Sequence, residues 1–138
     1  MSASPDTFLR QTFRKNERLC SRKIIEVLAL KGKKINEHPI RLQWIQSPLT
    51  TDVPVQAAFS VPKKNFKRAV DRNRLKRRMR ESYRKNKSYL SSLINSDNLQ
   101  YALLFVFSGK EIISYVDVEE KTKLILTRFV EDTQKHSH

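Results

Sequence analysis

The sequence has few of the residues that mark secreted or membrane proteins. It contains one cysteine, Cys20, and no apolar run of the ~18 residues that a membrane-spanning helix needs. A single cysteine excludes an internal disulfide, and no His or Cys partners stand near it at metal-ligand spacing. The first residues also lack the apolar centre of a secretory signal. These absences predict a cytoplasmic protein without a membrane-spanning helix, with Cys20 as a small buried thiol.

Acidic residues are scarce as well. The chain has 14 Asp and Glu against 28 Lys and Arg, which gives a formal net charge of +14. This excess predicts strong attraction to a polyanion, either nucleic acid or an acidic membrane surface. Hydrolysis of a phosphodiester by protein groups usually needs clustered carboxylates that bind two metal ions, and no such cluster is visible. We therefore expect neither catalytic residues nor a metal site in the chain itself.

The length bounds the domain organisation. With 138 residues and 38% apolar residues, the chain accommodates one domain with a modest core. Residues 1–16 are polar and basic and have neither helical nor alternating periodicity, which predicts a flexible arm. Residues 132–138 form a polar tail. We expect the single domain over residues 17–131.

The spacing of apolar residues predicts the order α-β-β-α-β-α. The expected helices span residues 21–31, 69–89 and 117–131. The expected strands span residues 40–44, 55–61 and 101–107. The last of these, YALLFVF, is continuously apolar, which is typical of a central strand buried on both faces. The polar residues 90–100 are expected to form a loop.

Most of the positive charge lies in residues 63–87. This segment has 13 Lys or Arg against two acids, so it accounts for +11 of the total +14. At about 100° per residue, Leu75, Met79 and Tyr83 share one side of the expected helix and should pack on the sheet. The opposite side is here named the basic face. It consists of Asn73, Arg77, Arg80 and Arg84.

The basic face has several possible explanations. A charged helix surface is most often simply solvated, but such surfaces mix Glu with Lys, whereas like charges here repel by about a few tenths of a kcal/mol per pair. DNA binding in the manner of leucine-zipper proteins would need heptads after the basic helix, and none follow. A membrane-surface helix would need bulky apolar residues that are already required for the core. RNA is the partner that fits best.

The stretch KKNFKRAVDRNRLKRRMRE, residues 63–81, resembles the signature of the bacterial ribonuclease P protein subunit. Its central RNR, residues 72–74, and the basic pairs that follow stand at the spacing of that family. The similarity extends more weakly over about residues 13–129. A ribosomal or RNA-chaperone protein would have similar charge and size, and the motif favours ribonuclease P over both.

The resemblance implies an α+β sandwich with helices on a central sheet and a left-handed β-α-β crossover, the ribosomal protein S5 domain 2-like fold. It also implies a subunit that joins a catalytic RNA and precursor tRNA and supports metal-dependent endonucleolytic removal of the 5′ leader, giving the mature tRNA 5′ end. The chemistry is then expected on the RNA subunit, with Mg²⁺ bound mainly by RNA. No obligate protein partner is inferred.

The residues expected to contact RNA come from the resemblance and from the basic face. They are Lys63, Lys64, Lys67, Arg68, Arg72, Asn73, Arg74, Lys76, Arg77, Arg80 and Arg84. Arg72 falls near the apolar side of the expected helix, so it has an alternative role as a brace for that helix.

The resemblance further implies a cleft, formed by the first helix and the sheet, that binds the single-stranded leader partly through aromatic contacts. Ile25 and Ala29 stand where many members of the family have aromatic residues. Phe13, Trp44 and Phe59 are candidate substitutes, although each is equally well explained as core. We expect leader contact to depend more on charge, shape and aliphatic surface.

Overall fold

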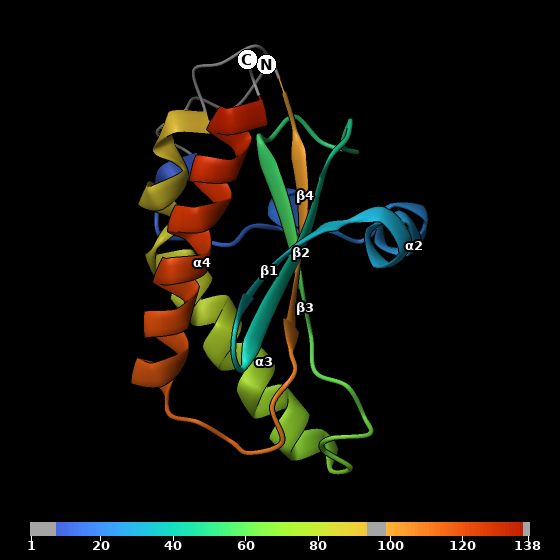
Figure 1. The fold of residues 1–138 in the computed structure, drawn as a ribbon, viewed down its shortest axis with the longest axis vertical. Helices are drawn as coiled ribbons and strands as arrows, with labels where there is room; N and C mark the ends of the chain where they lie inside the picture. Colours follow the sequence, from blue (N-terminus) through green and yellow to red (C-terminus); the bar gives the residue numbers. More distant parts are fainter. Residues whose placement is uncertain (1–7, 94–98, 137–138) are drawn as a thin grey trace.

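The structure, a computed structural model, describes residues 8–93 and 99–136. The elements are η1 (Lys15–Glu17), α2 (Arg22–Lys31), β1 (Lys33–Glu37), β2 (Ile40–Gln46), β3 (Val55–Ser60), α3 (Ala69–Lys85), η2 (Lys87–Leu93), β4 (Tyr101–Phe107) and α4 (Tyr115–His136). Figure 1 shows α3 and α4 on one face of the sheet and α2 on the other. The predicted α+β sandwich is confirmed.

The sheet has the strand order β1-β2-β4-β3. β2 pairs with β4 in antiparallel orientation, whereas β3 pairs with β4 in parallel. Six of the seven β4 residues are buried, so the prediction of a central strand for YALLFVF is confirmed. The connection from β3 to β4 passes through α3 and η2, and its left-handed sense remains a prediction from the resemblance.

One strand was not predicted. β1 pairs with β2 at the edge of the sheet, and Ile35 is its one apolar residue. The expected order α-β-β-α-β-α is therefore wrong by one strand, because charged side chains are common on an exposed edge strand and hide the alternation. α2 ends at Lys31, as predicted, and the N–H of the following Gly32 donates to the Leu28 carbonyl. A Cβ at this glycine would lie 2.5 Å from that oxygen.

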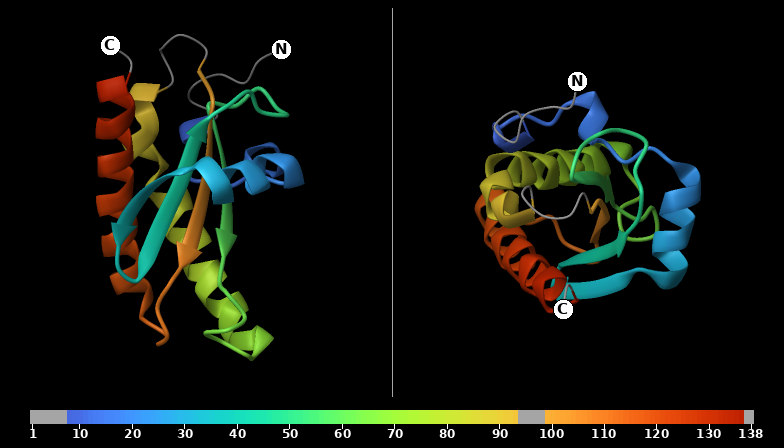
Figure 2. Two further views of the ribbon diagram at one scale, coloured as in Figure 1. Left: turned by 45° about the vertical axis from the view of Figure 1, so that its right-hand side comes forward. Right: turned by 90° about the horizontal axis from the view of Figure 1, so that it is seen from above.

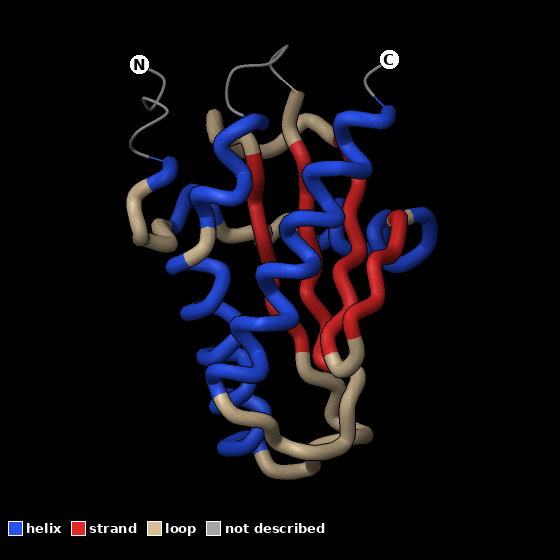
Figure 3. Tube along the Cα trace, turned by 60° about the vertical axis from the view of Figure 1, so that its left-hand side comes forward, coloured by secondary structure: helices blue, strands red, loops and turns tan. Residues whose placement is uncertain are grey.

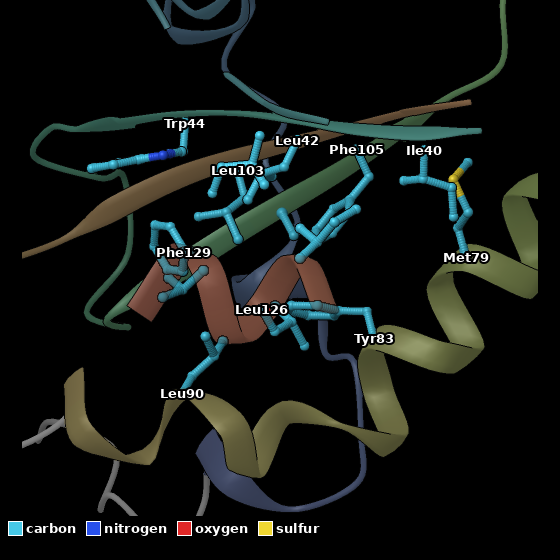
Figure 4. Packing of buried hydrophobic residues seen from close by; sticks show 14 of the residues in the cluster. Ile40, Leu42, Trp44, Met79, Tyr83, Leu90, Leu103, Phe105, Leu126 and Phe129 are labelled. Carbon is cyan, nitrogen blue, oxygen red and sulfur yellow. The ribbon is translucent and has the colours of Figure 1, made fainter. Parts of the chain in front are cut away.

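The main core lies between the sheet and the pair α3 and α4. Figure 4 shows Trp44 and Phe105 from the sheet directed towards Tyr83 and Phe129 from the helices. The rings of Trp44 and Phe129 meet edge to face with centroids 5.1 Å apart, a favourable geometry for aromatic pairs. This packing fixes α3 along one face of the sheet.

The other face of the sheet has a smaller core under α2. Leu19, Leu28 and Ala102 form its buried centre. The N–H of Ile24 donates to the Ser21 hydroxyl, so Ser21, where the helix was predicted to begin, caps the N-terminus of α2. Cys20 is exposed, so the prediction of a buried thiol is wrong. The adjacent Leu19 takes the buried position against β3 instead.

Residues 8–16 pack on the domain, in contrast to the flexible arm expected over residues 1–16. Phe8 is 3% exposed, and the Phe13 ring contacts those of Phe59 and Tyr83. These aromatic side chains bury apolar area that a free arm would expose. Residues 1–7 lie outside the described part of the chain.

Three helix boundaries also differ from the prediction. α3 ends at Lys85, four residues earlier than expected, and the side-chain amide of the following Asn86 donates to the Ser82 carbonyl. η2 replaces the start of the expected loop over 90–100, of which 94–98 lie outside the described residues. α4 begins two residues earlier than expected because Ser114 caps it. It continues beyond Glu131, so the polar tail expected over 132–138 is helical to residue 136, and residues 137–138 are not described.

Candidate nucleic-acid interface

The orientation of α3 follows from its apolar side. Leu75, Met79 and Tyr83 are fully or almost fully buried, as the spacing predicted. Figure 3 shows α3 and α4 against one side of the strands, so the side of α3 that points away from the sheet faces solvent. Asn73, Arg74, Arg77 and Arg80 are exposed on that side. The helix therefore presents its cations outward, on a support fixed by the core.

Most of these cations have no acidic partner among the residues that the structure describes. The ion pairs found within residues 8–93 and 99–136 join Arg84 to Glu81, Lys87 to Glu17 and Arg128 to Glu37. Arg77 and Arg80 on the basic face are therefore available to an external anion. Arginine suits a phosphate partner because its planar guanidinium can donate two parallel hydrogen bonds.

Arg84 differs from the rest of the basic face. Its guanidinium donates to the Glu81 carboxylate and to the carbonyl of Gln11. The hydrogen bond from Arg84 lowers the pKa of Glu81 below its ordinary value. Arg84 was expected to contact RNA, but the structure places it in contacts within the protein.

Arg72 braces the loop that precedes α3. Its guanidinium donates to the carbonyl oxygens of Phe66 and Lys67, at 2.7 and 2.9 Å. Phe66 is itself buried and meets the ring of Phe107 edge to face. These hydrogen bonds agree with the alternative role of Arg72 as a brace, and they connect α3 to the loop that precedes it.

The braced loop presents a second group of cations. Lys63, Lys64, Lys67 and Arg68 are all exposed, and the half-buried Lys76 follows on α3. Arg78 was not among the expected RNA contacts, and the structure agrees, because its guanidinium donates to the carbonyl of Ile113. The loop and the exposed side of α3 form one continuous segment of cations.

The aromatic candidates for a leader cleft lie on the wrong side of the sheet. Trp44 is 3% exposed and packs under α4. Phe13 and Phe59 contact each other and Tyr83 of α3. Side chains alternate between the faces of a strand, so residues that share a face with the main core cannot line a cleft beside α2.

On the α2 side, Ile25 is half-buried and Ala29 is exposed. A row of residues that was not predicted crosses the same face of the sheet at one end. It consists of Arg41, Val106 and Ser60, which are paired in register. Arg41 is half-buried, and its Nε has no hydrogen-bond partner among the described protein groups. The alternation of Arg41 with Leu42 was a signal that could have placed Arg41 on the face opposite Leu42, but it could not have identified the other two members of the row.

Two features are absent from the described residues. They contain no group of three or more His, Cys, Asp or Glu that could bind a metal ion. None of their helices is long and apolar enough to cross a membrane. Asp71 and Glu81, the two acids of α3, stand ten positions apart in sequence, and Glu81 is already paired with Arg84.

The fold and the cationic segment define a small α+β protein with one strongly basic surface. The sequence profile of the ribonuclease P family matches residues 13–129. The chain therefore belongs to the ribonuclease P protein family.

Individual relatives agree with this assignment. The chain is 32% identical over 125 residues to the ribonuclease P protein component of Porphyromonas gingivalis, covering 91% of this chain and 89% of that protein. It is 36% identical over 114 residues to the same component of Chlorobium phaeobacteroides, covering 75% and 78%.

Solved structures show the same fold. The RNase P protein of Staphylococcus aureus matches with a TM-score of 0.64 at 18% identity, covering 81% of this chain and 94% of that one. The RNase P protein from Thermotoga maritima matches with a TM-score of 0.63 at 23% identity, covering 81% and 96%.

Proposed function

We propose that this chain is the protein component of a ribonuclease P, in which it binds the catalytic RNA and the 5′ leader of precursor tRNA. In this role it supports metal-dependent endonucleolytic removal of the leader. The observation that carries the proposal is the cationic surface of α3 and its preceding loop, in a chain that belongs to this family.

The catalytic RNA is the proposed partner of the α3 surface. The contacts are assigned to Lys63, Lys64, Lys67, Arg68, Asn73, Arg74, Lys76, Arg77 and Arg80. Phosphate contacts dominate affinity for nucleic acids, and Asn73 adds one neutral donor and acceptor among the arginines. Arg72 acts indirectly, by fixing the loop on which four of these cations stand.

The leader is assigned to the α2 side of the sheet. The row of Arg41, Val106 and Ser60 lies next to the small core under α2. Ser60 is the last residue of β3, and the chain continues from it into the loop that precedes α3. Ile25 of α2 supplies aliphatic surface. We infer that leader binding uses charge and aliphatic contacts and that Phe13, Trp44 and Phe59 do not stack on leader bases.

The metal-dependent chemistry is assigned to the RNA. Mg²⁺ prefers several oxygen ligands, and the described residues do not group their carboxylates to provide them. In this proposal Mg²⁺ is bound mainly by RNA, and the protein's part is to bind and orient the two RNA molecules.

Reconstitution tests the proposal. The full-length protein is combined with a bacterial ribonuclease P RNA at low Mg²⁺, and cleavage of precursor tRNA is compared with and without protein. We expect stimulation of cleavage at the mature 5′ end. RNA binding without any stimulation would favour a ribosomal or chaperone role and refute the proposal.

Salt dependence tests the assigned surface. Arg77→Ala and Arg80→Ala should each weaken binding to the catalytic RNA, and should each reduce the slope of log K against log salt by about 0.7 to 0.9 for one lost phosphate contact. Lys123→Ala on α4 is the matched control, since it removes one exposed cation from another helix. Unchanged slopes for both arginine variants would show that the α3 surface does not face the RNA.

A further inference from the structure

The segment of residues 8–18, here named the N-terminal strip, lies beside the end of α3. Arg84 donates to the carbonyl of Gln11, and the Gln11 side chain reaches the carbonyl of Lys85. At its other end the segment meets the edge of β3, where the N–H of Leu19 donates to the Ala57 carbonyl at 2.9 Å. The right-hand view of Figure 2 shows the strip, in blue, running alongside α3.

The exposed charge of the N-terminal strip has one sign. Arg10, Arg14, Lys15 and Arg18 are all exposed. Glu17, its one acid, is only 2% exposed and therefore points into the protein. The strip thus presents four cations and no carboxylate to solvent.

A buried ion pair holds the strip in place. Lys87 of η2 is 0% exposed, and its ammonium donates to the Glu17 carboxylate and to the carbonyl of Thr12, the latter at 3.0 Å. It also lies 4.3 Å from the centre of the Phe8 ring. The other carboxylate oxygen of Glu17 accepts from the Arg14 N–H at 3.0 Å. The cations are therefore preorganised on a fixed backbone, which reduces the entropy lost on binding.

We propose that the N-terminal strip is a second RNA-binding surface that contacts the same catalytic RNA as α3, and that the Lys87–Glu17 pair positions it. This inference rests on the proposed function. The strip is continuous with the basic face, because Arg84 bonds to Gln11. The larger apolar side chains Phe8 and Phe13 are directed into the protein, so the strip has little with which to enter a membrane.

The charge distribution agrees with the binding of a single RNA to the strip and to the α3 surface. Residues 99–136, which include α4, have five Lys or Arg against six Asp or Glu. The excess of positive charge therefore belongs to the strip, α2 and the α3 surface and not to α4. A polyanion that lies along α3 and continues over the strip would neutralise both groups of cations together.

The test uses charge-neutral variants of the full-length protein. Arg14→Gln/Lys15→Gln should reduce the slope of log K against log salt by about 1.4 to 1.8 for two lost phosphate contacts with ribonuclease P RNA. The control Lys123→Gln/Lys135→Gln removes two exposed cations from α4, and it should change the slope by less than half as much. A strip variant that binds like this control would overturn the inference.

A second variant separates positioning from contact. Glu17→Gln/Lys87→Met removes no exposed charge but releases the strip, so it should weaken binding to ribonuclease P RNA several-fold. Its salt slope should change less than that of the strip variant. Circular dichroism checks that the domain stays folded. Unchanged affinity in a folded variant would show that the pair does not position the RNA-binding surface.

The outcomes distinguish the two proposals. If the wild-type protein fails to bind ribonuclease P RNA, the proposed function fails. If wild type binds and Arg77→Ala weakens binding, whereas Arg14→Gln/Lys15→Gln does not, the inference alone fails. If the strip variant alters only the dependence of precursor-tRNA cleavage on leader length, the assignment of the strip to the catalytic RNA is wrong.

Discussion

Replacing Lys87 by methionine tests how the N-terminal strip is attached to the domain. Lys87→Met keeps the length and most of the volume of the side chain but removes its ammonium. The variant loses the ion pair to Glu17, the hydrogen bond to the Thr12 carbonyl and the contact of the cation with the Phe8 ring. Glu17 is then left as a buried carboxylate whose remaining donor is the Arg14 N–H.

The expected loss of stability is large. Removing one partner of a buried ion pair costs about 3 to 5 kcal/mol, because the other charge stays buried without compensation. A small domain has a total free energy of unfolding of about 5 to 15 kcal/mol. Lys87→Met should therefore remove a substantial share of the stability and lower Tm by about 10 °C or more.

Urea unfolding of four proteins gives the measurement: wild type, Lys87→Met, Glu17→Gln and the double variant. The double variant should be more stable than the sum of the single effects predicts, by at least about 1.5 kcal/mol, because it buries no lone charge. A cost below about 1 kcal/mol for Lys87→Met, with additive effects, would refute the reasoning and show that Glu17 and Lys87 are solvated.

Three further predictions concern α3. Arg72→Lys replaces the guanidinium, whose Nη1 donates to both carbonyls, by an ammonium on a shorter side chain, so it should lose about one hydrogen bond and cost about 1 kcal/mol in urea unfolding. It should weaken RNA binding with an unchanged salt slope. A slope reduced by about 0.7 or more would mean that Arg72 contacts phosphate. Glu81→Gln should release Arg84 from its ion pair, so the variant should bind ribonuclease P RNA more tightly and with a steeper salt slope. An unchanged affinity would show that Arg84 stays bound to the protein. Burial raises the pKa of Tyr83 well above its ordinary value of 10.0, so this phenol ionises in the unfolded state before it does so in the folded state. The free energy of unfolding should therefore fall as the pH rises above about 10. Tyr83→Phe should abolish this part of the decline in urea unfolding measured from about pH 9 to 11, and an unchanged pH profile would show that Tyr83 does not cause it.

The sequence was sufficient to predict burial where apolar residues recur with one clear period or fill a whole segment. Leu75, Met79 and Tyr83 recur at helical spacing, and their burial follows the prediction. YALLFVF contains no polar residue, which sufficed to place β4 inside the sheet. In both cases the local pattern and the tertiary environment require the same residues.

The local sequence pattern did not predict features that depend on contacts between residues distant in sequence. Glu17 and Lys87 are 70 positions apart, so nothing near residue 17 indicated that it would be buried in an ion pair. β1 contains one apolar residue, and its strand conformation depends on pairing with β2. The side of the sheet on which Trp44 lies was also undetermined, because alternation defines two faces without saying which helices cover each.

The candidate site, too, could be predicted from the sequence only in part. The helical wheel correctly separated the buried side of α3 from the exposed one and placed Arg72 apart from the basic face. The wheel predicts the direction in which each side chain points but not the groups that it contacts. It therefore included Arg84 among the RNA contacts, although Arg84 donates hydrogen bonds to Glu81 and to the carbonyl of Gln11. The row of Arg41, Val106 and Ser60 needed the strand register, which brings together residues from three strands.

The strand order has a consequence for synthesis of the chain. β2 and β3 do not pair with each other, since β4 lies between them, and β4 is the last strand to be made. Until Tyr101–Phe107 leaves the ribosome, the hairpin of β1 and β2 and the unit of β3 and α3 have no strand that pairs with both. The most basic helix is thus complete before β4 and α4, which complete the burial of its apolar side, have been made. The sheet therefore closes in a late, non-local step, and a nascent chain that stops before β4 has two separate pieces of sheet.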